Sequence, residues 1–141
     1  MEYVLFEDLP MPPTSNHQYI SITRRGRTYR VASEELRTFK ELMSMYPNIF
    51  PDFKVKFHIV QDWAARKRPL EIRCTFYFKR ERLFTKDNRF KRLDVSNRLK
   101  ASHDSLSEIL EIDDSYFFKV VAIKAVTQGE ESFSAEIRPI R

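Results

Sequence analysis

Hydrophobic and polar residues alternate along several stretches of the chain, and this period of two is typical of β-strands with one buried face. Within residues 71–79, for example, Ile72, Cys74 and Phe76 occupy every second position. Two such stretches flank Gly26 and predict a hairpin that turns at this glycine. The three prolines within residues 9–16 predict an irregular connection there. The predicted strands are residues 3–8, 19–23, 27–31, 53–60, 71–79, 116–126 and 132–138.

Residues 33–46 predict a first helix instead. Ser33 is of the type that caps a helix N-terminus, and Glu34 and Glu35 follow it in what would be the first turn. Pro47 is expected to end this helix, because the residue before a proline is biased away from the helical conformation.

The segment RLDVSNRLKASHDSLSEILEIDD, residues 92–114, predicts a second helix with two different faces. At about 100° per residue, one arc of this helix is largely apolar and the opposite arc is polar. The apolar arc holds Val95, Leu99, Ser102, Leu106, Ile109 and Leu110, and the polar arc holds Asn97, Lys100, Asp104 and Glu108.

These elements together predict an α+β fold, in which a mixed sheet carries two main helices packed on one face. The length of 141 residues suits a single domain covering residues 1–141. No apolar run approaches the roughly 20 residues that span a bilayer, and the first residues lack the pattern of a signal peptide. A membrane association is therefore not expected. With one cysteine, the sequence is compatible with a reducing cytoplasm.

The charged residues are unevenly distributed along the chain, and this distribution points to a class of ligand. The net charge is +5, but residues 79–100 contain nine lysines and arginines against three acids. Residues 104–114 contain five acids and no base, and the predicted hairpin adds four arginines. Basic clusters of this kind favour binding to a polyanion such as nucleic acid, although a solvated surface would have the same composition.

Carboxylates at the two ends of the second helix raise a further possibility. Asp94 precedes the helix, Asp113 and Asp114 follow it, and Lys100 lies on its polar face. An ordinary helix with charged ends accounts for all of them, since a carboxylate stabilises a helix N-terminus. If the next strand runs back along the helix, however, Asp94 and Asp114 can converge to bind Mg²⁺, and Lys100 can neutralise charge that develops on a phosphate.

Four segments give the chain a resemblance to a known family. They are FEDLPMPPTSNHQY, RRGRTYRVASEE, KRLDVSNRLKASHDSL and EIDDSYFFKVVAIK, and they cover most of residues 3–46 and 69–126. The last two are the more specific, and in this order the segments resemble the RusA family of Holliday-junction resolvases, found in bacteria, phages and prophages.

The resemblance implies an α+β homodimer that binds branched or four-way DNA junctions in the cytoplasm of a bacterial host and nicks them symmetrically with Mg²⁺ or Mn²⁺. Residue by residue, Asp94 and Asp114 match metal-binding aspartates, and Asp113 beside Asp114 is a further candidate metal ligand. Lys100 matches the catalytic lysine, and Asn97 matches the asparagine of the core motif. The expected DNA-binding residues are Arg24, Arg25, Arg27, Arg30, Arg89, Lys91, Arg92 and Asn97.

Two features depart from the family pattern. Ser96 stands where the family has a second metal-binding aspartate, so one negative charge is missing. Residues 48–69 have no clear counterpart and are expected to add an edge strand. A binding protein that has lost catalysis through Ser96 is therefore an alternative to the nuclease, and a protein-interaction domain with an incidental charge pattern is another.

Overall fold

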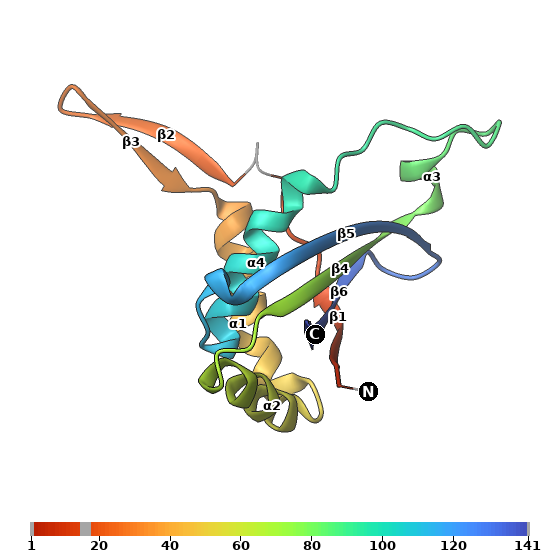
Figure 1. Cartoon of the computed structure of the whole chain (residues 1–141). Coiled ribbons are helices and arrows are strands. Elements are labelled where there is room, and N and C mark those ends of the chain that lie inside the picture. Colours follow the sequence, from red (N-terminus) through yellow and green to blue (C-terminus); the bar gives the residue numbers. More distant parts are fainter. Residues whose placement is uncertain (1, 15–17, 141) are drawn as a thin grey trace.

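A four-stranded sheet forms the centre of the protein, with the strand order β1-β6-β4-β5. The computed structural model describes residues 2–14 and 18–140, so the predicted irregular connection at residues 9–16 lies partly outside the described residues. The strands are β1 (Val4–Pro10), β4 (Leu70–Lys79), β5 (Phe117–Thr127) and β6 (Ser132–Pro139). β6 is antiparallel to β1 and to β4, while β5 is parallel to β4, which confirms the mixed sheet (Figure 1).

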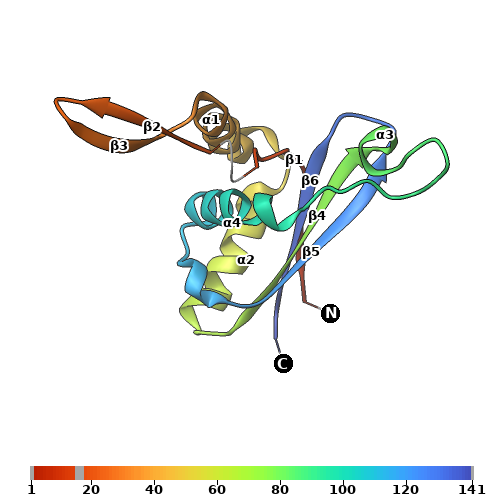
Figure 2. The same cartoon turned by 90° about the horizontal axis from the view of Figure 1, so that it is seen from above.

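The helices cover one face of this sheet, as predicted (Figure 2). They are α1 (Glu34–Ile49), α2 (Phe53–Ala65) and α4 (Ser96–Leu110), and a single turn, α3 (Arg80–Leu83), follows β4. The prediction of two main helices was too low, because α2 is a third. Within the described residues, no helix is both long enough and apolar enough to cross a membrane.

Helix α2 replaces the strand that was predicted for residues 53–60. Alternation of apolar residues favoured a strand, but Phe53, Phe57 and Val60 also follow the i, i+4, i+7 spacing of a helix. Phe53 and Val60 are buried, whereas Val55, which the strand pattern placed on the buried face, is 60% exposed. The helical spacing therefore decided the outcome, and no edge strand is added here.

Helix α1 begins as expected and ends later than expected. The Ser33 side chain accepts a hydrogen bond from the Leu36 backbone N–H at 3.1 Å, which confirms the N-cap. Pro47 does not end the helix, which continues to Ile49. Because Pro47 lies in the last turn, its missing N–H removes one helical bond only, and the Phe50 N–H still reaches the Tyr46 carbonyl at 2.9 Å.

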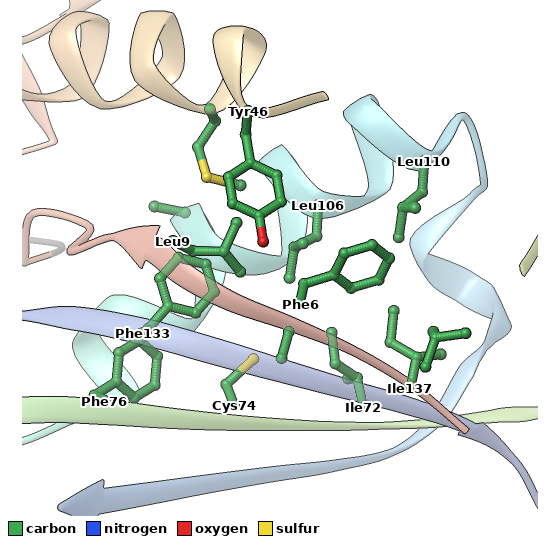
Figure 3. Packing of buried hydrophobic residues seen from close by; sticks show 14 of the residues in the cluster. Phe6, Leu9, Tyr46, Ile72, Cys74, Phe76, Leu106, Leu110, Phe133 and Ile137 are labelled. Atoms are coloured by element: carbon green, nitrogen blue, oxygen red, sulfur yellow. The ribbon is translucent and has the colours of Figure 1, made fainter. Parts of the chain in front are cut away.

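The core lies between the sheet and the helices (Figure 3). Phe6, Phe76, Phe133, Leu106 and Leu110 have no solvent-exposed surface. The rings of Phe76 on β4 and Phe133 on β6 stack at 5.6 Å. Burying a side chain of this size contributes about 1.5–3 kcal/mol, so the two leucines fix the orientation of α4 and thereby its outward face.

The predicted hairpin is present as a separate two-stranded sheet of β2 (Tyr19–Arg24) and β3 (Arg27–Ala32). It projects away from the rest of the protein in both views (Figures 1 and 2). We call it the ribbon. Gly26 has a φ of +75°, a conformation that favours glycine, which explains the turn at this residue.

Candidate nucleic-acid interface and catalytic residues

Helix α4 presents the two faces that the sequence predicted. Ser102, Leu106 and Leu110 are buried, while Lys100 and Asp104 are exposed. The outward face therefore carries the lysine of the predicted site.

Arg98 is the unexpected residue of α4, because it is charged and only 6% exposed. Its Nη1 donates a hydrogen bond to the Pro12 carbonyl at 2.7 Å, and its guanidinium lies 5.2 Å from the centre of the Phe78 ring. Arg98 thus ties the first turns of α4 to the proline-containing segment after β1 and to the sheet.

Asp94 lies just before α4, where its Oδ1 accepts two hydrogen bonds from Ser96. The backbone N–H of Ser96 is at 2.9 Å and its hydroxyl at 2.7 Å. The pKa of Asp94 is lowered below its ordinary value. The hydrogen bond from the Ser96 hydroxyl has the largest effect, the bond from the Ser96 backbone N–H follows, and the positive charge of Lys124 on β5 adds to the shift. The carboxylate is therefore ionised at neutral pH.

Asp113 and Asp114 follow α4, at the short 3₁₀ helix η2 (Asp114–Tyr116) that leads into β5. The Ser115 backbone N–H donates to Asp113 Oδ1 at 2.8 Å, and this bond is the main cause of a lowered pKa for Asp113. The chain runs back beside α4 at this point, as the distance of 5.9 Å between the ring centres of Phe117 and His103 shows. Burial lowers the pKa of His103, and the nearby negative charges of Asp104 and Asp114 oppose that shift.

These contacts place the two predicted metal-binding aspartates beside different turns of α4. Asp94 lies just before its start, near Lys124, whereas Asp114 lies near His103, in the middle of the helix. The convergence of Asp94 and Asp114 on one metal ion, expected from the sequence, stays a prediction. Across residues 2–14 and 18–140, no three His, Cys, Asp or Glu side chains come close enough together to hold a metal ion.

Lys100 lies beside Arg30, one of the predicted DNA-binding residues. Its Nζ lies 3.9 Å from Asp104 Oδ2, and both side chains are largely exposed. Lys100 also lines a hollow of about 430 Å³ whose other walls are Gln18, Tyr19 and Arg30. Asn97 is half-buried one turn away, and its backbone carbonyl accepts a hydrogen bond from Gln18 Nε2 at 3.4 Å.

The remaining predicted DNA-binding residues occupy two projecting arms. Arg24, Arg25 and Arg27 lie exposed at the tip of the ribbon. Residues 84–95 form the second arm, with Arg89, Lys91 and Arg92 exposed. In both views the start of α4 lies between the two arms (Figures 1 and 2). Asp94 and Lys100 are thus flanked by positive charge on both sides.

Comparison with protein families identifies the chain. The model of the family described as endodeoxyribonuclease RusA matches residues 10–137, nearly the whole sequence. The chain belongs to the RusA family. This membership makes the chain a relative of endodeoxyribonucleases that resolve Holliday junctions, as the sequence motifs predicted.

Other comparisons add little to the RusA assignment. None of the curated proteins matches the chain significantly. Among solved structures, two of 2C-methyl-D-erythritol-2,4-cyclodiphosphate synthase, one with CDP bound, are 12% and 11% identical over 96% of this chain and 95% of theirs, with TM-scores of 0.33 and 0.32. The Plasmodium vivax enzyme is 9% identical over 99% of this chain and 95% of its own, with a TM-score of 0.29. Similarity this low carries no argument about function.

The carboxylates of this RusA-family chain do not form a complete ligand cage for magnesium, but they suit an ion that also binds waters and DNA phosphates. A cage made only of protein side chains is not formed by the described residues. Magnesium, however, usually keeps several waters and binds through one or two carboxylates together with substrate phosphates. The exposed and ionised Asp94 and Asp113, and the exposed Asp114, are donors of that kind.

Three residues of the interface escaped the sequence analysis. Lys124 approaches Asp94 through β5, and its Nζ donates to the Leu93 carbonyl at 3.0 Å. Tyr19 lies beside Arg30 and Lys100, and Arg98 holds the start of α4. Each proximity depends on how distant segments pack, for which the sequence offers no local signal; only the exposed aromatic at the base of a basic hairpin could have drawn attention to Tyr19.

Proposed function

We propose that this RusA-family chain is a magnesium-dependent, structure-selective endonuclease that nicks four-way DNA junctions symmetrically as a homodimer in the cytoplasm of a bacterial host. The observation that carries the proposal is the position of Asp94 and Lys100 between two exposed basic arms. Arginine and lysine side chains fix the position of a nucleic-acid backbone through its phosphates, so DNA held by both arms passes over the start of α4.

The two arms also suit a branched substrate. Contacts to phosphates carry no sequence information, and a protein that recognises a junction has to read shape. The ribbon and residues 84–95 extend in different directions from α4 (Figure 2), so each arm can follow a different duplex that leaves the branch point. A continuous duplex would engage the two arms less completely.

Asp94, Asp113 and Asp114 are the residues that would hold magnesium, and Mn²⁺ would substitute for it. When bound, the ion supplies a more acidic water and neutralises charge on the leaving oxygen. Lys100 contributes its ammonium charge to the phosphate on which negative charge develops. Asp104, one turn away, limits the directions in which Lys100 points through their ion pair.

A homodimer fits the symmetry of the substrate, because two identical sites related by a two-fold axis can act on two strands of like polarity. The free edge of β5 supports the presence of a partner. β5 is the outermost strand and pairs with β4, and no other strand of the described residues pairs with it. Its side chains Phe118, Val120 and Val126 are 75%, 44% and 43% exposed. A long apolar edge of this kind is a ready template for another strand.

The test is a nicking assay on a synthetic four-way junction and on a linear duplex of the same sequence, with and without Mg²⁺. Wild type should nick the junction symmetrically and the duplex far more slowly. Asp94→Asn, Asp114→Asn and Lys100→Ala should each lose at least about a hundredfold in rate, the scale on which removing one electrostatic catalytic group acts. Asp62→Asn is the matched control, because Asp62 is an exposed carboxylate on α2 that pairs with Arg66 at 3.2 Å. A folded wild type that nicks neither substrate would contradict the proposal.

Ser96 favours a second candidate, a junction-binding protein with impaired catalysis. Its N–H and hydroxyl both donate to the same oxygen of Asp94, where the family carries another carboxylate. Asp94 is therefore engaged by neutral donors rather than joined by a second acid. Ser96→Asp separates the two candidates: the binding protein gains nicking from none, whereas a nuclease nicks already without this change.

A further inference from the structure

The hollow between the ribbon and α4 has the chemistry of a nucleotide site. Its lining side chains are Tyr19 and Arg30 from the base of the ribbon, Lys100 from α4 and the amide Gln18. Among the described residues, two cations, one aromatic ring and no carboxylate line it. A volume of about 430 Å³ lies within the range of roughly 300–1,000 Å³ that small-molecule sites occupy.

Tyr19 and Arg30 are already in contact with each other in the lining of this hollow. The Arg30 guanidinium carbon lies 4.9 Å from the centre of the Tyr19 ring. Strand pairing explains the contact: Arg30 lies opposite Ser21 and diagonal to Tyr19, on one face of the ribbon, whereas Tyr29 pairs with Ile22 on the other face. Aromatic rings and guanidinium planes are the surfaces on which unpaired bases stack.

The base of the ribbon is tied to the body of the protein, so the hollow does not depend on a loose hairpin. Gln18 is 3% exposed, and its Nε2 donates to the carbonyls of Pro13 at 3.2 Å and Asn97 at 3.4 Å. The Ser33 N–H donates to the Gln18 carbonyl at 2.8 Å, which joins the ribbon to the start of α1. The distance between Tyr19 and α4 is thereby set by buried contacts.

We propose that this hollow receives one unstacked nucleotide from the branch point of the DNA, with its base on the Tyr19–Arg30 pair and its phosphate beside Arg30 and Lys100. The inference rests on the proposed function and adds a site to it. A base at a branch point costs less to unstack than one inside a duplex, which is a source of selectivity for branched DNA. Capturing that nucleotide beside Lys100 places the adjoining phosphate at the start of α4.

A photocross-linking experiment tests the contact directly. Four-way junctions carry 5-iododeoxyuridine at single positions flanking the branch point and are irradiated with the full-length protein in EDTA. Mass spectrometry then locates the cross-linked residue. Tyr19 is the expected acceptor, at one branch-point position and not at positions within the arms of the junction. Cross-links that fall only on the ribbon tip or on residues 84–95 would overturn the inference.

Affinity measurements supply the matched controls. Stacking of one base corresponds to about a 5- to 150-fold change in affinity, so Tyr19→Ala should weaken junction binding by a factor in this range while Tyr19→Phe keeps it. Tyr29→Ala removes a similarly exposed tyrosine from the opposite face of the same ribbon and should change affinity less than threefold, about 0.6 kcal/mol.

The outcomes separate this inference from the proposed function. If wild type binds no junction, both fail. If wild type binds and nicks the junction but Tyr19→Ala behaves like Tyr29→Ala and Tyr19 is not cross-linked, the nucleotide site alone is refuted. Circular dichroism and the urea midpoint of each variant exclude a loss of fold as the cause.

Discussion

Replacing the three arginines at the tip of the ribbon should change the salt dependence of DNA binding by a calculable amount. Arg24, Arg25 and Arg27 are exposed at the tip of the ribbon. Each is therefore available to neutralise one phosphate. Counterion release makes the logarithm of the binding constant fall with the logarithm of salt concentration by about 0.9 for each neutralised phosphate.

Changing all three to glutamine should thus reduce the steepness of this dependence by about 2.7. If wild type and variant bind equally at 1 M salt, the variant binds about 500-fold more weakly at 0.1 M, or about 3.7 kcal/mol. The decrease applies to any DNA with a normal backbone, since phosphate contacts position the DNA and do not read its sequence.

Fluorescence anisotropy of a labelled four-way junction, titrated between about 50 and 300 mM NaCl in EDTA, measures the slope. A charge-matched control changes Lys40 on α1, Lys54 at the start of α2 and Arg66 at its end, all exposed, to glutamine. The ribbon variant should lose slope and the control should not. An unchanged slope for the ribbon variant, or an equal loss in both, would refute the assignment of the ribbon as a DNA-binding arm.

Three further predictions concern stability. Arg98→Ala should lower the free energy of unfolding by about 2–4 kcal/mol in urea denaturation, because it removes a charged hydrogen bond to Pro12 and the contact with the Phe78 ring. Leu106→Ala should cost about 2–5 kcal/mol by the same measurement, since Leu106 is fully buried against the sheet, whereas Leu42→Ala, at a position 47% exposed, should cost far less. Burial lowers the pKa of His103 in the folded state, so the unfolded chain binds the proton more readily; stability should fall as the pH drops below about 6.5 and level off below the folded pKa, and His103→Gln should remove this part of the pH dependence of the urea midpoint.

The sequence predicted correctly the elements whose hydrophobic pattern fits only one type of secondary structure. Ile72, Cys74 and Phe76 alternate in a strand buried on one face, and β4 is that strand. Gly26 lies at the turn of the ribbon because a positive φ is needed there. Ser102, Leu106 and Leu110 set the buried face of α4 correctly, which made the exposure of Lys100 predictable.

Where the apolar residues fit both the period of a strand and the period of a helix, the predicted element was wrong. Phe53 fits both a strand and a helix, and the partners that decide between them, such as Phe6 at a ring distance of 5.7 Å, come from a distant part of the chain. Pro47 was expected to break α1 as a proline in a helix interior does, although it lies in the last turn of α1, where it costs less. The prediction of an edge strand and of only two main helices therefore failed at Phe53, and the predicted end of α1 failed at Pro47.

The candidate site was predictable in composition but not in arrangement. The residue types at Asp94, Lys100 and Asp114 follow from the motifs, yet their separation depends on where the chain returns beside α4. That return places Phe117 at His103 and Lys124 near Asp94, contacts set by the register of β5 against β4. The sequence therefore predicted the chemistry of the interface and left its geometry to the fold.

The central claim is that Asp94 and Lys100, at the start of α4, act on a phosphate of a bound junction. The most direct measurement is a crystal structure of the protein with a four-way junction and Mn²⁺, in which anomalous scattering locates the metal. We expect Mn²⁺ between a DNA phosphate and the carboxylate of Asp94, with Lys100 beside the same phosphate. Manganese bound away from Asp94, with the DNA backbone away from the start of α4, would contradict the account.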